Sequence, residues 1–595
     1  MKGELAVKDK LVLVTVAVMM GWSAGSGAQE TAARMPVRFV YIQTNHLVDK
    51  NVAEAIGVLQ RAAKQGYNGV VIADSKFMRW DSQPQRYIDN ARKVRDACRD
   101  LKMTYNPCVF PIGYSNDLLA RDPNLAEGLP VVDAPFVVRG GKLVPAPDPI
   151  AIANGGFEKH GEKGWDGWQF VDQPGKISFA DVEVKCEGAA SLRMQDIGKN
   201  DPRNGHGRAH QKLKVRPFAN YHVSAMVKTQ DFESASEARI AIIGAVVAAG
   251  AEKDKQGAAR DVSLNYLNTG IRKTQDWKRV DATFNSLEFS EVNLYFGVWG
   301  GKGGTIWWDD ARIEPAGLVN VLRRDGTPVR VASEDGKTVY AEGKDFEKIV
   351  DPKLGVDLWP GGYSAWHEAP APAVLPGGAF KEGQRVLISY YHPALIYDGA
   401  VMCCLAEPKV AEILSWQAAQ VRKNLEPDGY FMSHDEIRAQ GWDESCARSK
   451  KTPGQLLAGN VKRCVEILRQ TDPGKPAYVW SDMFDPNHNA RKTGRYYLVK
   501  GDGPWQGSWE GLPKDVIVAN WNSQENERAA ALKHFESLGI RQFLAGYYDA
   551  DPKRITPWLA DAAGIKGMEG VMYTTWERNY SDLEAFAAVC WGSRP

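Results

Sequence analysis

The 595-residue sequence has no excess of charge of either sign, few cysteines and no long apolar run. Its 74 basic and 73 acidic residues leave a net charge of +1, which excludes the strongly basic surface expected of a nucleic-acid-binding protein. None of the eight cysteines forms a Cys-x-x-Cys pair and no histidine lies at zinc-finger spacing from them, so we expect no structural metal site built on the cysteines. The apolar run Leu11–Trp22 is shorter than the roughly 20 residues that span a bilayer, so we expect no stable membrane insertion.

Aromatic residues, by contrast, are abundant in a composition that is otherwise typical of a globular protein. The chain contains 19 Trp, 21 Tyr and 19 Phe, and 44% of all residues are hydrophobic. Large flat rings either fill a core or stack on the apolar faces of sugar rings, and composition alone does not distinguish the two uses.

The N-terminus has the three parts of a secretory signal peptide. Lys2, Lys8 and Lys10 precede the apolar run, and small residues follow it up to Ala28. This order of a basic start, a short apolar segment and a small-residue cleavage site directs export. We therefore predict that residues 1–28 are a signal peptide and that the mature protein is secreted or periplasmic.

Strand patterns and amphipathic helical patterns alternate in two separate parts of the chain. Residues 36–111 contain three apolar strands, and residues 406–595 contain five more. Strands that alternate with helices indicate a parallel sheet, and eight strands match a (β/α)8 TIM barrel. The predicted fold class is therefore α/β, a TIM barrel interrupted after its third strand. This count assigns one further strand, Val386–Tyr391, to the inserted β structure.

The chain between the two barrel parts has a different pattern. Residues 112–150 are rich in Pro, Gly and Asp and are predicted to be loops. Residues 152–315 contain short alternating strands with frequent turn signals and no long helix, which is typical of a β-sandwich of the jelly-roll type. Residues 316–405 are predicted to be a β-rich connecting region with Asp-Gly turns.

Acidic and aromatic residues follow four of the last five predicted barrel strands. Because TIM-barrel active sites are built from the loops at the carboxyl ends of the strands, we expect these residues to share one site. Acids and aromatic rings together indicate a cleft that takes an oligosaccharide or polysaccharide. The candidates, in chain order, are His434, Asp435, Glu436, Trp480, Asp482, Tyr547, Tyr548, Asp549, Trp576 and Glu577.

The adjacent pair Asp435 and Glu436 is the most specific of these features. Neighbouring side chains on a strand point to opposite faces, so both reach one site only where the strand gives way to a loop, which is where the pair is predicted to lie. Two close carboxyl groups separate their pKa values, leaving one protonated and one ionised. Glycosidic cleavage needs such an acid together with a negative group near the oxocarbenium-like centre.

These motifs resemble glycoside hydrolase family 20, and more loosely family 123, over residues 37–110 and 408–593. In family 20 an adjacent Asp-Glu ends strand four, and the substrate's own 2-acetamido group replaces an enzyme nucleophile. The resemblance implies that Glu436 is the general acid/base and that Asp435 orients the acetamido group and stabilises an oxazolinium-like intermediate. It also implies sugar contacts from the strand-end residues Trp480, Tyr547 or Tyr548, Asp549, Trp576 and Glu577.

The sequence departs from family 20 in two places. The segment after strand one reads Gln43-Thr-Asn-His46, where the family usually has an arginine that grips the terminal sugar. The family's His-x-Gly-Gly-Asp-Glu pattern is reduced to Ser-His-Asp-Glu at residues 433–436. Exo action on a terminal sugar is therefore left open.

Three hypotheses follow. The first is an exported retaining hydrolase that cleaves β-linked 2-acetamido sugars with assistance from the substrate and needs no cofactor. The second keeps Glu436 as the acid but uses Asp482 or Glu577 as an enzyme nucleophile, on sugars without an N-acetyl group. The third is a non-catalytic glycan-binding protein that retains the pocket.

Residues 152–315 separately resemble carbohydrate-binding modules of the family 4/9 type. The matching parts are Asn154-Gly-Gly-Phe-Glu158, Gly164-Trp-Asp-Gly-Trp168 and Trp307-Trp-Asp-Asp310. Trp165, Trp168 and Trp299 are candidates for sugar stacking, although rings at such positions are often buried. Asp309 and Glu158 are candidates for a structural calcium site, because calcium prefers oxygen ligands.

Overall fold

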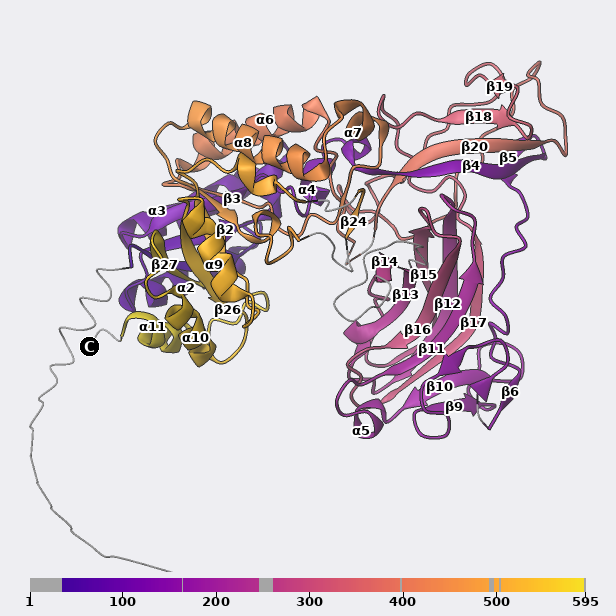
Figure 1. Ribbon diagram of the computed structural model, residues 1–595, viewed down its shortest axis with the longest axis horizontal. Coiled ribbons are helices and arrows are strands. Elements are labelled where there is room, and N and C mark those ends of the chain that lie inside the picture. Colours follow the sequence, from indigo (N-terminus) through magenta and orange to yellow (C-terminus); the bar gives the residue numbers. More distant parts are fainter. Residues whose placement is uncertain are drawn as a thin grey trace, which may run out of the picture.

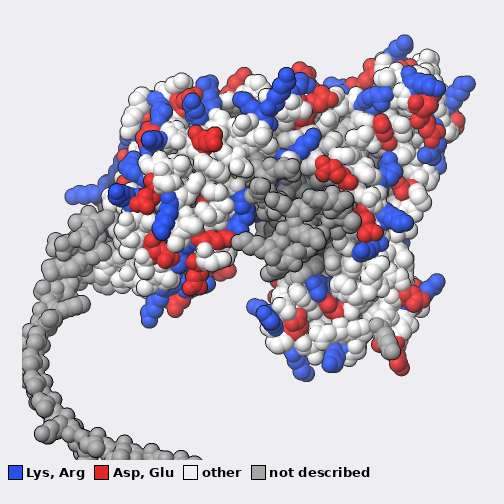
Figure 2. All heavy atoms as spheres, in the orientation of Figure 1, with Lys and Arg blue, Asp and Glu red and all other residues white. Residues whose placement is uncertain are grey.

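The computed structural model describes residues 35–592 apart from 163, 246–260, 396, 398, 492–496 and 502–504. The predicted signal peptide, residues 1–28, lies outside the described residues. Over the described part of the chain, no helix is both long and apolar enough to cross a membrane. Basic and acidic side chains are interspersed over the face shown in Figure 2, in keeping with the small net charge.

Eight parallel strands close into a barrel, which confirms the predicted barrel and its strand count (Figure 1). The order of strands around the barrel follows their order in the chain, and β27 pairs with β1 to close it. The strands are β1 (Val37–Gln43), β2 (Gly69–Ala73), β3 (Thr104–Val109), β21 (Tyr430–Met432), β23 (Ala477–Trp480), β25 (Ile517–Asn520), β26 (Arg541–Tyr547) and β27 (Met568–Thr574).

Side chains at alternate strand positions fill the interior of the barrel. Phe39 lies against Tyr478 and Phe543, with ring centroids 5.6 and 6.0 Å apart. These rings belong to one cluster of buried side chains drawn from all parts of the barrel wall. Because the interior is packed, the space for a ligand lies at the ends of the strands.

Amphipathic helices cover the outside of the barrel (Figure 1). On α2 (Asp49–Lys64) the buried residues Val52, Ala55, Leu59 and Ala62 recur at the three- and four-residue spacing of one helix face. The other barrel helices are α3 (Gln85–Asp100), α6 (Pro408–Leu425), α8 (Pro453–Thr471), α9 (Arg528–Ser537), α10 (Thr556–Ala562) and α11 (Leu583–Trp591).

The chain between β3 and β21 forms two five-stranded sheets whose strands pair antiparallel and which pack face to face (Figure 1). Contact between the two sheets includes Phe296 on one and Trp308 on the other, with ring centroids 5.6 Å apart. One sheet has the order β15-β12-β17-β10-β9 and the other β14-β13-β16-β11-β8. The strands are β8 (Phe170–Val171), β9 (Ser178–Asp181), β10 (Ser191–Gln195), β11 (Gly207–Lys214), β12 (Asn220–Gln230), β13 (Ala238–Ala245), β14 (Asp261–Asn265), β15 (Gln275–Asn285), β16 (Glu291–Val298) and β17 (Thr305–Pro315).

A third five-stranded sheet corrects the prediction of loops over residues 112–150. Its order is β19-β18-β20-β4-β5, and its longest strand, β4, lies inside the segment predicted to be loops. The predicted strand at Val386–Tyr391 becomes β20 in this sheet and is not part of the barrel. The strands are β4 (Gly128–Arg139), β5 (Lys142–Pro145), β18 (Arg330–Ser333), β19 (Val339–Tyr340) and β20 (Arg385–Pro393).

Candidate active site

A cavity of about 870 Å³ opens at the carboxyl ends of the barrel strands. Side chains from β1, β23 and the loops that follow most of the other strands line it, so it occupies the position at which TIM barrels carry their active sites. Its lining includes Tyr41, Asn45, Asp74, Lys76, Tyr114, Asp117, Tyr397, Asp435, Glu436, Trp480, Trp521, Trp576 and Arg578.

The backbone after β21 places Asp435 and Glu436 together in this lining. Glu436 has a φ of 49°, in the left-handed region, so the chain departs from strand geometry at the pair. The N–H of Glu436 donates to Oδ2 of Asp482 at 2.9 Å, which fixes the turn. Gly113 allows the close approach of the neighbouring loop, because a Cβ there would lie 1.5 Å from the carbonyl oxygen of Asp435.

Two groups that were not among the predicted site residues hold the Glu436 carboxylate. The Tyr114 hydroxyl donates to Oε2 in a short hydrogen bond, and the Arg438 guanidinium lies 2.8 Å from the same atom. Arg438 in turn lies over the rings of Tyr397 and Tyr497, 4.4 and 5.5 Å from their centroids. Glu436 is thus an oriented carboxylate at the cavity wall, and Arg438 is its counter-charge.

Asp435 lies among other carboxyl groups. Burial, and then the nearby charges of Asp482 and Glu436, hold the pKa of Asp435 well above its usual range. The Arg438 charge acts in the opposite direction. The Asp435 carboxyl group therefore favours its neutral form, and positive charge that develops beside it would favour the carboxylate.

Asp482 differs from the expected substrate contact because its side chain is fully buried behind the cavity wall. Its oxygens accept hydrogen bonds from the Glu436 N–H, from Asn489 Nδ2 at 2.9 Å and from Trp521 Nε1 at 3.1 Å. Burial is the main cause that raises the pKa of Asp482, to about 6. Asp482 thus positions Glu436 and Trp521 and does not line the cavity.

Aromatic rings form one wall of the cavity. Trp480 and Trp576, both predicted from the sequence, line it with their ring centroids 6.1 Å apart. Tyr41 at the end of β1 lies 5.8 Å from Trp480 and 5.4 Å from Trp576. The Trp576 ring is 44% exposed, so it offers a flat apolar surface to a ligand.

The two tyrosines at the end of β26, Tyr547 and Tyr548, have different surroundings. The Tyr547 hydroxyl donates to Asp582 at 2.7 Å and its ring stacks on Tyr573, so it is engaged away from the acidic pair. The Tyr548 hydroxyl is buried and has no hydrogen-bond partner among the described residues. Its pKa is raised by burial and then by the charges of Asp482, Asp435 and Glu436, so the Tyr548 side chain lies within electrostatic reach of all three carboxyl groups.

Asp549 and Glu577 belong to the support of this wall. Asp549 Oδ2 accepts hydrogen bonds from the backbone N–H groups of Trp576 and Glu577 at 2.8 and 3.1 Å. Asp549 therefore holds the loop that carries Trp576. Glu577 is exposed and is absent from the cavity lining, which differs from its expected sugar contact.

His434 also differs from the expected sugar contact. Its ring is fully buried, and Nε2 lies 3.0 Å from Asn460 Oδ1. Burial lowers the pKa of His434 to about 4, so the ring is neutral at physiological pH. His434 follows β21 and points away from the cavity, which its neighbours Ser433 and Asp435 line.

The cavity residues that were not among the predicted site residues include Tyr114, Asp117, Trp521 and Tyr397, whose ring lies against Arg438. Tyr114, Asp117 and Trp521 follow β3 and β25. The rule that residues just after a barrel strand line the site, here called the strand-end rule, predicted the acidic pair and also applies to them. Burial raises the pKa of Asp117 to about 7, with Arg79 at 3.9 Å acting against this shift. Tyr397 comes from the loop after β20, a segment whose path no barrel pattern reveals.

The predicted calcium pair has another use in the structure. Asp309 accepts backbone N–H groups on both oxygens, including Cys186 N–H at 2.7 Å, and Glu158 accepts that of Ala189 at 2.7 Å. Backbone N–H groups thus bind both oxygens of Asp309 and one oxygen of Glu158, and the calcium site stays a prediction. Trp165 and Trp168 are 6% and 8% exposed and belong to the core, whereas Trp299 is only half-buried.

No family model matches the sequence, and no curated protein matches it. Among solved structures, a glycoside hydrolase family 20 β-N-acetylglucosaminidase is 9% identical over 94% of this chain and 69% of its own, with a TM-score of 0.34. The chitobiase of Flavobacterium johnsoniae is 18% identical over 32% of this chain and 30% of its own, with a TM-score of 0.22. A family 16 carbohydrate-binding module is 16% identical over 27% of this chain and 98% of its own, with a TM-score of 0.19. At such low TM-scores, neither the fold nor the activity of this chain follows from the likenesses.

Proposed function

We propose that the protein is an exported glycoside hydrolase that cleaves β-linked 2-acetamido sugars with retention, assisted by the substrate. The observation that carries this proposal is the adjacent pair Asp435 and Glu436 in a cavity walled by Trp480 and Trp576. Tyr548 is not part of the cavity lining, but its ring lies 6.3 and 6.2 Å from those of Trp521 and Trp576, and its hydroxyl has no partner among the described residues. Flat rings suit the apolar faces of a sugar, and the carboxyl groups suit glycosidic cleavage.

Glu436 acts as the general acid and then as the general base, which requires that the proton favoured on Asp435 in the free protein lies on Glu436 when the substrate is bound. Its carboxyl proton passes to the glycosidic oxygen as the bond to the anomeric carbon breaks. The acetamido carbonyl oxygen attacks the anomeric carbon and closes an oxazolinium ring. The Glu436 carboxylate then takes a proton from a water molecule, which attacks the same carbon and restores the original configuration.

Asp435 and Tyr548 position the acetamido group. The Asp435 carboxylate accepts the amide N–H and stabilises the positive charge of the oxazolinium ring. Since burial and neighbouring acids favour the neutral form of Asp435, its ionised form gains most when that cation develops. The Tyr548 hydroxyl gains a hydrogen bond to the acetamido oxygen, which supplies the partner that it otherwise lacks.

A conventional enzyme nucleophile is less well supported by the geometry. Asp482 is fully buried, and its oxygens already accept three N–H donors. Glu577 lies outside the cavity lining. Neither side chain is placed to attack an anomeric carbon beside Glu436, and this favours the acetamido group as nucleophile.

A row of aromatic rings supports a polymeric substrate. Tyr397 at the cavity stacks parallel to Tyr266 with centroids 6.4 Å apart, Trp299 lies 6.0 Å from Tyr266, and Tyr295 lies 6.1 Å from Trp299. The last three belong to the strands or strand ends of the sheet β14-β13-β16-β11-β8. We propose that the β-sandwich is a carbohydrate-binding module and that this row binds further sugar units.

Four aryl glycosides test the proposal. β-N-acetylglucosaminide and β-N-acetylgalactosaminide are compared with the matching glucoside and galactoside, using the wild type, Glu436→Gln and Glu412→Gln. Glu412 is an exposed residue of α6 and provides the matched control. Hydrolysis of the acetamido substrates alone, lost in Glu436→Gln and kept in Glu412→Gln, supports the proposal. Equal hydrolysis of the plain glycosides would move the nucleophile onto the protein, and binding without turnover would leave a glycan-binding protein.

A further inference from the structure

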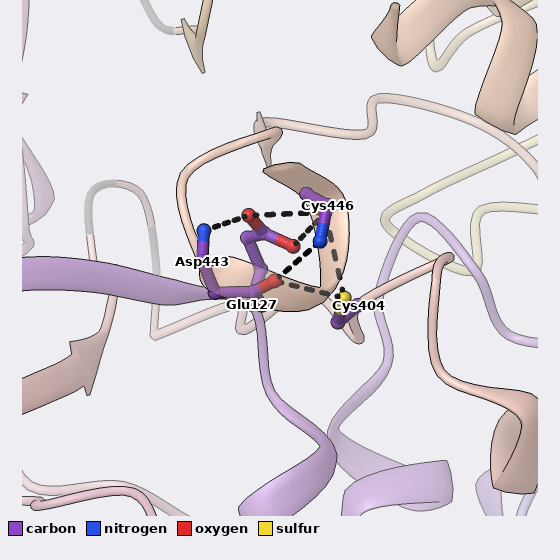
Figure 3. A group of neighbouring side chains, drawn as sticks. All are labelled: Glu127, Cys404, Asp443 and Cys446. Atoms are coloured by element: carbon purple, nitrogen blue, oxygen red, sulfur yellow. Dashed lines mark hydrogen bonds between the residues drawn. The ribbon is translucent and has the colours of Figure 1, made fainter. Parts of the chain in front are cut away.

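Two cysteines and two carboxylates converge outside the cavity, at the base of the segment that follows the acidic pair (Figure 3). Glu127 immediately precedes β4, Cys404 lies in the loop before α6, and Asp443 and Cys446 begin the short helix α7 (Glu444–Ser449). All four side chains are at most 3% exposed. One ligand atom from each lies within 4.8 Å of the ligand atoms of the other three.

Three of the six distances between these atoms are close to the edges of a tetrahedron around one zinc ion. Zinc binds sulfur at about 2.3 Å and carboxylate oxygen at about 2.0 Å, which gives edges of roughly 3.8 Å between two sulfurs and roughly 3.5 Å between sulfur and oxygen. The Sγ atoms of Cys404 and Cys446 are 3.5 Å apart. Cys404 Sγ lies 3.5 Å from Asp443 Oδ1, and Cys446 Sγ lies 3.4 Å from Glu127 Oε2.

A second layer of polar groups orients the four side chains. Gln440 Nε2 donates to Glu127 Oε2 at 2.9 Å and to Cys446 Sγ at 3.0 Å. The Trp442 N–H donates to Glu127 Oε1 at 2.7 Å, and Arg324 donates to Asp443 Oδ2 at 2.6 Å. Outer-layer donors of this kind are typical of metal sites, where they fix the ligand orientation.

We propose that Glu127, Cys404, Asp443 and Cys446 bind one structural Zn²⁺ ion. Soft thiolates combined with carboxylates in tetrahedral geometry suit zinc better than calcium or magnesium, which take oxygen ligands alone. The thiols lose their protons to solvent when the ion binds, and no electron is transferred. In the metal-bound protein Arg324 offsets part of the negative charge of the four ligands.

The ion would tie together segments that lie more than 300 residues apart in the chain. The segment from Glu436 to Asp443 carries the acid of the proposed reaction at one end and a zinc ligand at the other. The loop of Cys404 also contacts the loop of Tyr114, since the Ser115 N–H donates to the Val401 carbonyl at 3.0 Å. Zinc would therefore hold the two loops that orient Glu436, whatever sugar the cavity takes.

Local sequence patterns did not reveal this site because its ligands come from three segments. The expectation of no metal site rested on the absence of Cys-x-x-Cys pairs, and Cys404 and Cys446 are 42 residues apart. The chain path through the third sheet brings them together.

Zinc content of the purified full-length protein tests the proposal. We expect one zinc per chain in the wild type and in Cys403→Ser, and none in the double variant Cys404→Ser/Cys446→Ser. Cys403 is the matched control because it is equally buried, is adjacent in sequence and is not one of the four ligands. Measuring metal content keeps this test separate from the proposed hydrolase activity.

If the double variant does not fold, a second measurement on the wild type tests the proposal. The wild type is stripped of metal under reducing conditions and titrated with Co²⁺ alone. We expect the visible bands of tetrahedral cobalt with a sulfur-to-metal charge-transfer band, saturating at one ion per chain, and a weakened complex in Glu127→Gln. A wild type that binds neither ion in its reduced form would overturn the proposal, as would a Cys404–Cys446 disulfide in the exported protein or unchanged zinc in the double variant.

Discussion

Oδ2 of Asp482 accepts the backbone N–H of Glu436 at 2.9 Å, while Oδ1 accepts the indole N–H of Trp521 at 3.1 Å. One buried carboxylate thus fixes both the turn that carries the proposed acid and a ring of the cavity wall. Protonation of Asp482 would therefore disturb the turn and the ring together.

We expect activity to fall on the acid side with an apparent pKa near 6. The pKa of Asp482 is raised to about 6, so the carboxylate takes up a proton as the pH falls through this value. A neutral carboxyl group accepts N–H groups more weakly than a carboxylate, so the turn at Glu436 loosens. The measurement is kcat/KM against pH, with Asp482→Asn expected to be slower and to lack this acid limb. An unchanged limb in Asp482→Asn would assign it to another group.

We expect Asp435→Asn to raise thermal stability at pH 7 while it lowers activity. The pKa of Asp435 is raised in the folded protein, so the folded state binds more protons than the unfolded chain above about pH 4 and loses stability as the pH rises. Asparagine has no charge to bury, so the variant does not lose this stability as the pH rises. The melting temperature of the variant should exceed that of the wild type by a few degrees at pH 7, and the difference should vanish near pH 4. A difference that is the same at both pH values would contradict the electrostatic cause.

We expect Tyr548→Phe to reduce kcat by about 10- to 100-fold, the value of one hydrogen bond to a group that gains charge. The same change should leave stability unaltered or slightly higher, because the buried hydroxyl has no partner among the described residues. Kinetics and a melting curve on one preparation check both effects. Tyr547→Phe serves for comparison, since its hydroxyl bonds to Asp582 and its loss should cost stability.

We expect the aromatic row to affect long substrates alone. Tyr266→Ala combined with Trp299→Ala should raise KM for a polysaccharide several-fold and leave the hydrolysis of an aryl glycoside unchanged. Trp359→Ala is the control, because its ring is 58% exposed and lies outside the row. Equal effects on both substrates would show that the row stabilises the cavity and does not bind further sugar units.

The barrel could be predicted from the sequence because each of its strands is a short apolar run between turn signals or helices. The strand β4 could not, since Pro130 and Pro135 interrupt its pattern. Both prolines lie in the half of β4 that pairs with β20 alone, whereas β5 pairs with residues 136–139, so the missing N–H groups face no second strand.

The acidic pair and the rings of Trp480 and Trp576 could be predicted because they follow barrel strands. The strand-end rule did not separate side chains that face the cavity from those that support it. His434 and Asp482 obey the rule and yet are fully buried, and Tyr547 is engaged with Asp582. Which side a residue faces after a strand depends on backbone angles such as the φ of Glu436, which no spacing in the sequence reveals.

The measurement that tests substrate assistance most directly is kcat for aryl 2-acetamido glycosides in which the acetyl group carries none, one, two or three fluorine atoms. Fluorine withdraws electrons from the carbonyl oxygen and weakens it as a nucleophile, while the leaving group and the sugar stay the same. If the acetamido oxygen attacks the anomeric carbon, kcat falls at each added fluorine. If kcat is the same across the series, a group of the protein is the nucleophile and the proposed mechanism is wrong.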